Sequence, residues 1–143
     1  MGSFYIGEEE RLGASTLDTH IWLWSLLEPE RLTCRVAREL EDPKNGLWLS
    51  PISTWELLVL HEKRRIVLNE DARTWIAKAM VTIPVSEAPV THEVALETLN
   101  VTLPHRDPAD RFLVATARVF ELTLITADER LTACRDIRVL PNR

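Results

Sequence analysis

Residues 107–128 read DPADRFLVATARVFELTLITAD, a stretch that passes from a helical pattern to a strand pattern. Asp107 followed by Pro is typical of a helix start, because Asp caps free N–H groups and Pro is favoured at the first helical position. The apolar residues that come next recur at helical spacing: Phe112, Ala115, Val119 and Phe120. The stretch therefore predicts a helix over 108–120, a strand over 122–126, and an acidic residue, Asp128, just beyond the strand.

The same alternation of short apolar runs and longer helical patterns continues through the rest of the chain. The predicted strands cover 14–18, 47–50, 82–85, 122–126 and 137–140. The predicted helices cover 20–28, 31–42, 53–64, 70–81, 89–99, 108–120 and 128–134. Strands that alternate with helices indicate a parallel sheet covered on both faces. We expect an α/β fold, a single domain of three α/β/α layers with a mostly parallel central sheet of about five strands.

Composition limits the classes of protein to consider. Apolar residues make up 45% of the 143 residues and charged residues 27%, as in ordinary globular domains. The longest apolar run is far shorter than the roughly 20 residues that span a bilayer, so no membrane segment is expected. The start of the chain lacks a signal-peptide pattern, which predicts a cytoplasmic protein. Residues 1–13 carry a charge run and three glycines, and we expect a flexible N-terminal leader there.

Charge and cysteine content narrow the function further. The net charge of −5 argues against a protein that coats nucleic acid, but it is compatible with a nucleic-acid enzyme whose acids surround a metal. Cys34 and Cys134 lack the spacing of a metal site and are too few for a disulfide framework, so both are expected to be ordinary thiols.

Four acidic residues lie near points where a predicted strand or loop is followed by a predicted helix: Asp18, Glu56, Asp110 and Asp128. In a parallel sheet these points share one edge, where open α/β sheets bind ligands. Two carboxylates about 4 Å apart repel by about 4 kcal/mol at an effective dielectric constant near 20. Such a group needs a proton or a cation, and Mg²⁺ or Mn²⁺ prefers oxygen ligands. The pattern predicts a divalent cation site.

Helix capping is the alternative explanation for each acid taken alone. Ser53-Thr-Trp-Glu56 has the form of a capping box, Asp107-Pro-Ala-Asp110 places a cap before Pro, and Thr126-Ala-Asp-Glu129 repeats the pattern. An acid in the first helical turn gains about 0.3–1 kcal/mol from the helix dipole without any ligand. Capping alone does not require four carboxylates at four openings of one sheet, because Ser or Thr caps equally well.

Four segments, in this order along the chain, resemble the PIN domain and more narrowly the VapC-type toxins of bacterial toxin–antitoxin pairs. They are Leu17-Asp18-Thr-His-Ile-Trp-Leu-Trp, Ser53-Thr-Trp-Glu56-Leu, His105-Arg-Asp-Pro-Ala-Asp110-Arg-Phe-Leu-Val-Ala-Thr-Ala and Leu124-Ile-Thr126-Ala-Asp128-Glu-Arg-Leu. The resemblance extends over about residues 14–141, so we assign a PIN-like domain to residues 14–143.

The resemblance implies a Mg²⁺-dependent endoribonuclease, with Mn²⁺ as a substitute ion. It also implies a homodimer that acts on RNA and is held inactive by a cognate antitoxin, which binds operator DNA. Asp18, Glu56, Asp110 and Asp128 match the catalytic, metal-binding quartet of the family, with Asp18 and Asp110 as the expected direct ligands. Thr126 matches the hydroxyl residue before the last acid, where it either orients a water or a carboxylate or caps the following helix. Asp107 is then either a helix N-cap or a residue that supports the metal ligands without binding the metal itself.

Two other functions remain open. A catalytically inactive PIN-fold interaction module that binds an antitoxin-like partner would be expected to lack one of the acids, yet all four are present. A phosphatase or receiver-type phosphoryl-transfer protein is disfavoured, because Asp18-Thr-His lacks a paired aspartate and no lysine follows the strand over 122–126.

Basic and aromatic residues supply candidate contact surfaces. The basic residues near the expected site bind RNA phosphates or are solvated surface charges: His105, Arg106, Arg111 and Arg130. A structural ion pair is a further alternative for Arg111. Trp22 and Trp24 lie on a helix that is apolar almost all round, which indicates core packing, a homodimer face or a groove for an antitoxin helix.

Overall fold

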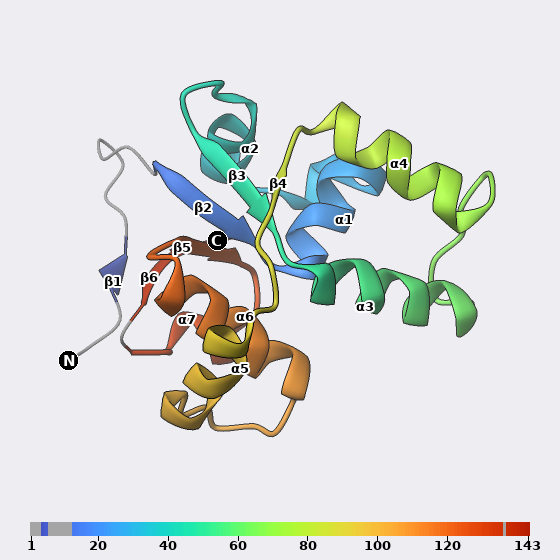
Figure 1. Ribbon diagram of the computed structural model, residues 1–143. Helices are drawn as coiled ribbons and strands as arrows, with labels where there is room; N and C mark the ends of the chain where they lie inside the picture. The colour runs from blue at the N-terminus through green and yellow to red at the C-terminus, as the bar shows by residue number, and fades with distance from the viewer. Residues whose placement is uncertain (1–3, 6–12, 136) are drawn as a thin grey trace.

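The computed structural model describes residues 4–5, 13–135 and 137–143, and an all-parallel sheet lies at its centre (Figure 1). The strands are β1 (Phe4–Tyr5), β2 (Ala14–Leu17), β3 (Gly46–Leu49), β4 (Ser86–Glu87), β5 (Thr123–Thr126) and β6 (Arg138–Pro141). Their order across the sheet is β1-β6-β5-β2-β3-β4. Five of them belong to the expected domain, and β1 adds an edge beside β6 from the N-terminal segment. Most of the predicted leader lies outside the described residues.

Helices cover both faces of this sheet. They are α1 (Thr19–Leu27), α2 (Cys34–Glu41), α3 (Pro51–Glu62), α4 (Ala72–Thr82), α5 (His92–Glu97), α6 (Pro108–Val119) and α7 (Glu129–Thr132), with short 3-10 turns at Pro29–Arg31 and Thr98–Asn100. Figure 1 shows α1, α3 and α4 on one side of the sheet and α5, α6 and α7 on the other. The three-layer α/β/α prediction is therefore confirmed. None of the helices in the described part of the chain is long and apolar enough to cross a membrane.

Two hydrophobic clusters fill the spaces between the sheet and its helical layers. The first receives Ile21, Val36, Leu57 and Ala79 from helices α1 to α4. The second receives Val94, Val114 and Leu131 from helices α5 to α7. Neighbouring residues of one strand enter opposite clusters: Leu124 and Val139 join the second, Ile125 and Leu140 the first. This is the two-residue alternation of a strand that is covered on both faces.

Of the helix starts in the described residues, only that of α6 agrees with its predicted position, and the caps explain three of the differences. Helix α3 begins at Pro51, because the Ser50 hydroxyl caps it by accepting from the Ile52 N–H at 3.1 Å. The capping-box interpretation of Ser53-Thr-Trp-Glu56 is therefore wrong, and both ends of that motif lie inside the helix. Helix α2 begins only at Cys34, because Thr33 caps it. Helix α7 is capped by Asp128 rather than by Thr126.

The fourth strand also differs from its prediction over 82–85. Helix α4 continues through Thr82, and the strand β4 is only Ser86–Glu87. Pro84 explains the shift, because it lacks an N–H and forces the residue before it out of the helical conformation. Ile83 is accordingly extended, with φ −120° and ψ 96°. The strand can begin only after this break.

The order of the strands defines the crevice in which a ligand would bind. From β2 the chain proceeds to β3 and β4 on one side, whereas β5 and β6 lie on the other. The direction of winding thus changes between β2 and β5, and open α/β sheets bind ligands beyond the carboxyl ends of the strands at such a point. Asp18 comes directly after β2, and its N–H donates to the Ile125 carbonyl of β5 at 3.0 Å. Asp128 follows the end of β5.

Candidate metal centre

Asp18 lies between β2 and α1, and its carboxylate accepts a hydrogen bond from a residue of β5. It occupies the N-cap position of α1, yet its side chain makes no capping hydrogen bond. The Thr126 hydroxyl instead donates to Oδ2 of Asp18 at 2.6 Å. Only 6% of Asp18 is exposed. Capping therefore does not explain an acid at this position.

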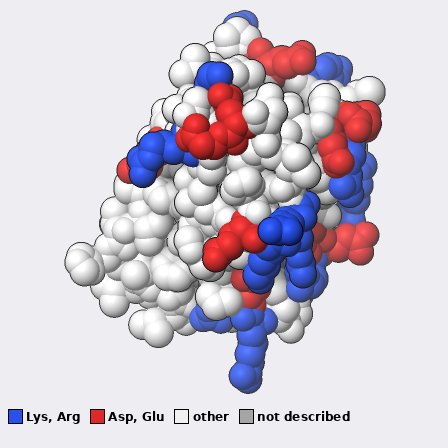
Figure 2. All heavy atoms as spheres, turned by 90° about the vertical axis from the view of Figure 1, so that its right-hand side faces the viewer, with Lys and Arg blue, Asp and Glu red and all other residues white. Residues whose placement is uncertain are grey.

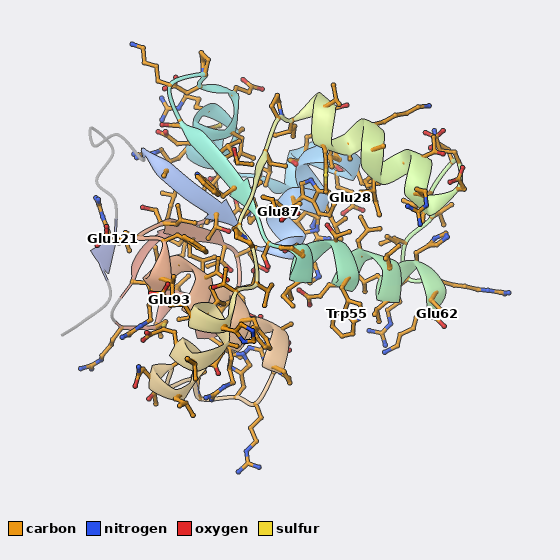
Figure 3. The ribbon with its side chains drawn as sticks, viewed as in Figure 1. Glu28, Trp55, Glu62, Glu87, Glu93 and Glu121 are labelled. Carbon is orange, nitrogen blue, oxygen red and sulfur yellow. The ribbon has the colours of Figure 1, made fainter. Side chains whose placement is uncertain are left out.

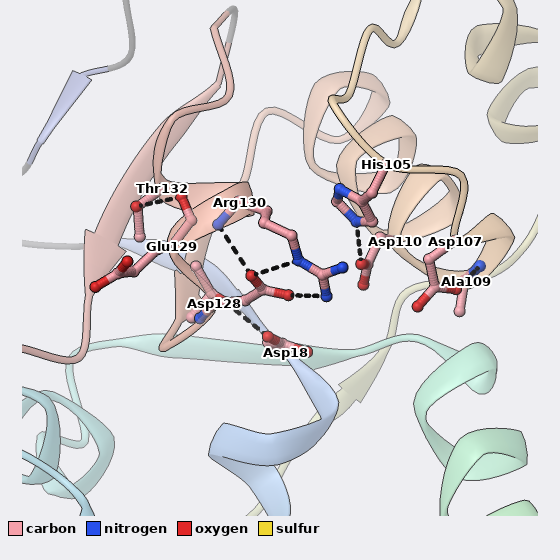
Figure 4. Close-up of polar contacts among 10 residues, drawn as sticks. Asp18, His105, Asp107, Ala109, Asp110, Asp128, Glu129, Arg130 and Thr132 are labelled. Atoms are coloured by element: carbon pink, nitrogen blue, oxygen red, sulfur yellow. Dashed lines mark hydrogen bonds and ion pairs between the residues drawn. The ribbon is translucent and has the colours of Figure 1, made fainter.

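Asp110 lies in the first turn of α6, and a histidine holds it. Asp107 is the N-cap, since its Oδ1 accepts from the Ala109 N–H at 3.0 Å. Asp110 does not cap: it is 6% exposed, and its Oδ2 lies 2.6 Å from Nε2 of His105 (Figure 4). Nδ1 of His105 is buried and has no hydrogen-bond partner among the described residues. The tautomer with its hydrogen on Nε2 suits this environment, because it donates to Asp110 and leaves no buried N–H unpaired.

Glu56 reaches the site from the second turn of α3. Its Oε1 lies 2.6 Å from Oγ1 of Thr19, which is also 2.9 Å from Oγ of Ser53. Both hydroxyl residues are buried. Because Thr19 directly follows Asp18, this contact fastens the start of α1 to α3. It brings Glu56 and Asp18 to one site.

Asp128 differs from the other acids because an arginine holds both of its carboxylate oxygens. Nε of Arg130 lies 3.1 Å from Oδ1 and Nη2 lies 2.8 Å from Oδ2, as Figure 4 shows. The backbone N–H of Arg130 also donates to Oδ1 at 2.9 Å, which makes Asp128 the cap of α7. Thr126 accepts from the Asp128 N–H at 3.0 Å while it donates to Asp18. Thr126 therefore orients a carboxylate instead of capping α7.

The environments of the four acids shift their pKa values in two directions. Burial is the main reason why the pKa of three of them is raised above the ordinary carboxyl value: Asp18, Glu56 and Asp110. Mutual repulsion adds to this, since Asp18 and Asp110 both raise the pKa of Glu56. The pKa of Asp128 is lowered, chiefly by its hydrogen bonds from Arg130. Three acids are thus destabilised as anions, and the fourth is stabilised by the protein itself.

Several potential ligand atoms lie close enough to share one cation. One ligand atom each of His105, Asp110 and Asp128 lies within 4.8 Å of the others. Asp18 and Glu56 are not in this group, although the charge of Asp18 acts on Asp110 and that of Asp110 acts on Glu56. Carboxylate oxygens are the ligands that Mg²⁺ and Mn²⁺ prefer, so Asp110 and Asp128 fit a hard divalent cation. His105 holds Asp110 through Nε2 and does not offer that nitrogen as a ligand.

Three neighbouring pockets open around these acids and share His20. One of about 230 Å³ is lined by Asp18 and Asp128, and one of about 260 Å³ by Glu56 and Asp107. The third, about 570 Å³, is a largely apolar groove between α1 and the end of α3. Its lining includes the apolar residues Leu23, Trp24, Leu27, Leu60, Ile66 and Val67 and the charged residues Glu28, Arg31 and Arg65. We call it the α1/α3 groove. It shares Trp24 as well as His20 with the first pocket.

The aromatic and basic candidates take separate roles. Trp22 is fully buried against Trp75, as the core interpretation expects, whereas Trp24 lines the groove beneath the guanidinium of Arg31, 4.1 Å from its ring centroid. Arg111 donates to the Thr98 carbonyl at 2.6 Å, which is a structural role, though not an ion pair. Basic and acidic side chains are interspersed on the face shown in Figure 2, so no single-sign field covers it.

The sequence did not predict the contacts of three residues that hold the acids, His105, Thr19 and Arg130, or that of Ser53, which contacts Thr19. His105 was expected at most to meet phosphates, and it contacts Asp110. The only signal for Thr19 was its position next to Asp18, and Ser53 was assigned to a cap. Their contacts depend on how α1, α3 and the loop before α6 pack, which local patterns do not encode.

Comparison with known proteins places this arrangement in a family. The family model of the PIN domain matches residues 16–136. Ribonuclease VapC22 of Mycobacterium tuberculosis is 33% identical over 125 residues, which cover 85% of this chain and 92% of that protein.

Solved structures show the same fold at lower identity. VapBC2 from Rickettsia felis, bound to a DNA fragment from its promoter, aligns with a TM-score of 0.66 and 13% identity over 88% of this chain and 96% of its own. VapBC-5 from Mycobacterium tuberculosis, a member of the VapBC family of toxin–antitoxin systems, aligns with a TM-score of 0.56 and 17% identity over 90% and 98%. Since the family model spans most of the sequence and a 33% identical relative covers 85% of it, the chain belongs to the PIN-domain family and, within it, to the VapC-like proteins.

Proposed function

We propose that this protein is the toxin of a type II toxin–antitoxin system, a Mg²⁺-dependent endoribonuclease that cleaves RNA phosphodiester bonds. The observation that carries the proposal is the convergence of three carboxyl groups with raised pKa values from three different elements: the buried Asp18 and Asp110 and the half-buried Glu56. Repelling buried acids of this kind are unfavourable without a cation. The name of the relative, a ribonuclease, supports the choice of RNA as substrate.

In this proposal Asp18 and Asp110 hold the cation directly, while Glu56 and Asp128 complete the site. Mg²⁺, or Mn²⁺ in its place, would polarise a phosphate oxygen and lower the pKa of a bound water. The surrounding residues keep the carboxylates in place: Thr126 fixes one oxygen of Asp18, and His105 fixes one oxygen of Asp110. Outer contacts of this kind typically change metal affinity or activity by about 10–100-fold.

We further propose two protein partners and a cytoplasmic place of action. The structural relatives include VapBC complexes, which favours a cognate antitoxin, and the apolar α1/α3 groove suits an amphipathic segment. A second copy of the chain is the other partner. Trp55 and Leu58 are 58% and 41% exposed on α3, an apolar surface of the kind that interfaces cover. Figure 3 shows Trp55 pointing away from the sheet.

Cleavage of RNA by two matched variants tests the proposal. Asp107→Asn and Asp110→Asn each remove one charge from the start of α6, and Asn caps a helix as well as Asp does. We expect Asp110→Asn to abolish cleavage and Asp107→Asn to keep most of it, in a purified protein assayed with Mg²⁺ and with EDTA. An active Asp110→Asn protein, or cleavage that persists in EDTA, would contradict a metal-dependent site at Asp110. Either result would indicate that a contaminating nuclease cleaves the RNA and that the protein itself is an inactive interaction module.

A further inference from the structure

Arg130 is the feature of the site that the proposed mechanism leaves unused. Its guanidinium bridges both oxygens of Asp128, at 3.1 and 2.8 Å. A carboxylate that is held at both oxygens in this way has few lone pairs left for a cation. In this arrangement Asp128 cannot join Asp18 and Asp110 as a full ligand until the guanidinium moves.

The position of Arg130 lets it move without disturbing the fold. Its side chain is 55% exposed, whereas that of Asp128 is 25% exposed. The cap of α7 uses the backbone N–H of Arg130 and not its side chain, so α7 keeps its start when the guanidinium leaves. Figure 4 shows the guanidinium between Asp128 and the pair formed by His105 and Asp110, at the centre of the acidic site.

The charges around Arg130 show that it belongs to the whole acidic site. Asp128, Asp110 and Asp107 all raise the pKa of its guanidinium, with Asp128 the largest contributor. Arg130 is therefore a cation supplied by the chain at the place where the proposed metal would bring positive charge. Two cations in such a site repel each other, so a bound metal and a guanidinium on Asp128 oppose each other.

We propose that Arg130 has two positions, on Asp128 in the free protein and on a phosphate of the RNA in the complex, so that RNA binding releases Asp128 for the cation. The inference rests on the proposed function of the same site. A guanidinium pairs with a phosphate through the same two-pronged geometry as with a carboxylate, so the exchange keeps its hydrogen bonds. By linkage, RNA then strengthens cation binding and the cation strengthens RNA binding. Without RNA the site still binds its cation, but less tightly than it does with RNA.

The test uses Arg130→Gln, with Arg106→Gln as the control for the Mn²⁺ measurement and the wild type as the reference for RNA binding. Arg106 is exposed next to His105 and Asp107, and its replacement changes the net charge by the same amount. Binding of Mn²⁺ alone is measured by calorimetry. Binding of a short fluorescent single-stranded RNA is measured separately in EDTA over a range of salt concentrations, so that no cleavage occurs. Thermal melting confirms that both variants fold.

The two affinities should change in opposite directions. We expect Arg130→Gln to bind Mn²⁺ at least about fivefold more tightly than Arg106→Gln, the lower end of usual coupling between sites. It should bind RNA more weakly, and the slope of log K against log salt should fall by about 0.7, the value for one phosphate contact on a single strand. Equal Mn²⁺ affinities in the two variants, or unchanged RNA binding by Arg130→Gln, would overturn the two-position role. An Asp18→Asn protein that binds Mn²⁺ as well as the wild type would instead overturn the metal site itself.

Discussion

Single hydroxyl groups decide how the acids of this site are presented. Thr126 donates to Asp18 and accepts from the N–H of Asp128, so one side chain connects two members of the quartet. Thr19 contacts one member of the quartet, Glu56, and fixes one of its carboxylate oxygens. These contacts favour the charged carboxylates, yet burial still raises the pKa of Asp18 and Glu56. These hydroxyl groups therefore hold carboxylates that the proposed cation would neutralise.

Thr126→Val tests this role. The valine keeps the shape of the side chain and removes the donor to Asp18, so the carboxylate loses one fixed oxygen. We expect cleavage of RNA and affinity for Mn²⁺ to fall by about 10–100-fold, as for other contacts behind metal ligands. Thr123→Val, a buried change at the other end of β5, serves as the control and should leave both quantities close to those of the wild type. A Thr126→Val protein with wild-type Mn²⁺ affinity would remove Thr126 from the site.

Helix α6 and strand β5 were the parts of the site that local patterns predicted best. The Asp107-Pro pair identified the start of α6, and the apolar run before Asp128 identified β5. The start of α3 was missed because Ser50-Pro and Ser53-Thr-Trp-Glu56 both have the form of a cap, and only packing decides between them. The contacts of His105 and Arg130 were beyond sequence reasoning, since a charged side chain near a site can meet a phosphate or an acid equally well.

Ser50→Ala measures the start of α3 directly. Ser50 is buried and caps the helix through its hydroxyl. We expect the free energy of unfolding to fall by about 1 kcal/mol, the usual cost of losing a Ser cap. Urea denaturation followed by circular dichroism gives this value. Stability equal to that of the wild type would mean that α3 does not depend on this cap and that the motif at 53–56 serves instead.

The whole molecule brings the acids together through the order of its strands. The parallel sheet and both helical layers follow from the alternation of patterns along the chain, and the structure confirms them. The predicted position of the edge strand β4 was wrong, because Pro84 interrupts an apolar run that has the pattern of one strand. What no segment reveals alone is that β2 and β5 are neighbours, because they are far apart in sequence. That pairing puts Asp18 beside Thr126.

The metal-free protein should gain stability as the pH falls from 7 toward 5. Folding raises the pKa of Asp18, Glu56 and Asp110, so the native state binds protons at a higher pH than the unfolded state does. This contribution is complete below the unfolded values, which are near 4, and is lost as the pH rises through the raised values. The lowered pKa of Asp128 acts in the opposite direction, but only at pH values below its unfolded one.

Thermal melting in EDTA at a series of pH values measures this effect. The double variant Asp18→Asn, Asp110→Asn should show a flatter dependence between pH 7 and 5, since two of the three groups no longer take up protons. A wild type that loses stability over the same interval would show that other groups dominate, and the raised pKa values would no longer describe the site.

The most direct test of the central claim, that the four acids form a cation site, is the change in melting temperature on adding Mg²⁺ or Mn²⁺. A cation present at 100 times its Kd stabilises a folded protein by about 2.7 kcal/mol, which for a domain of this size is a rise of about 5–10 °C. The wild type should show this rise, and Asp18→Asn should show much less, because one of the two proposed direct ligands is gone. An equal rise in both proteins would contradict the claim.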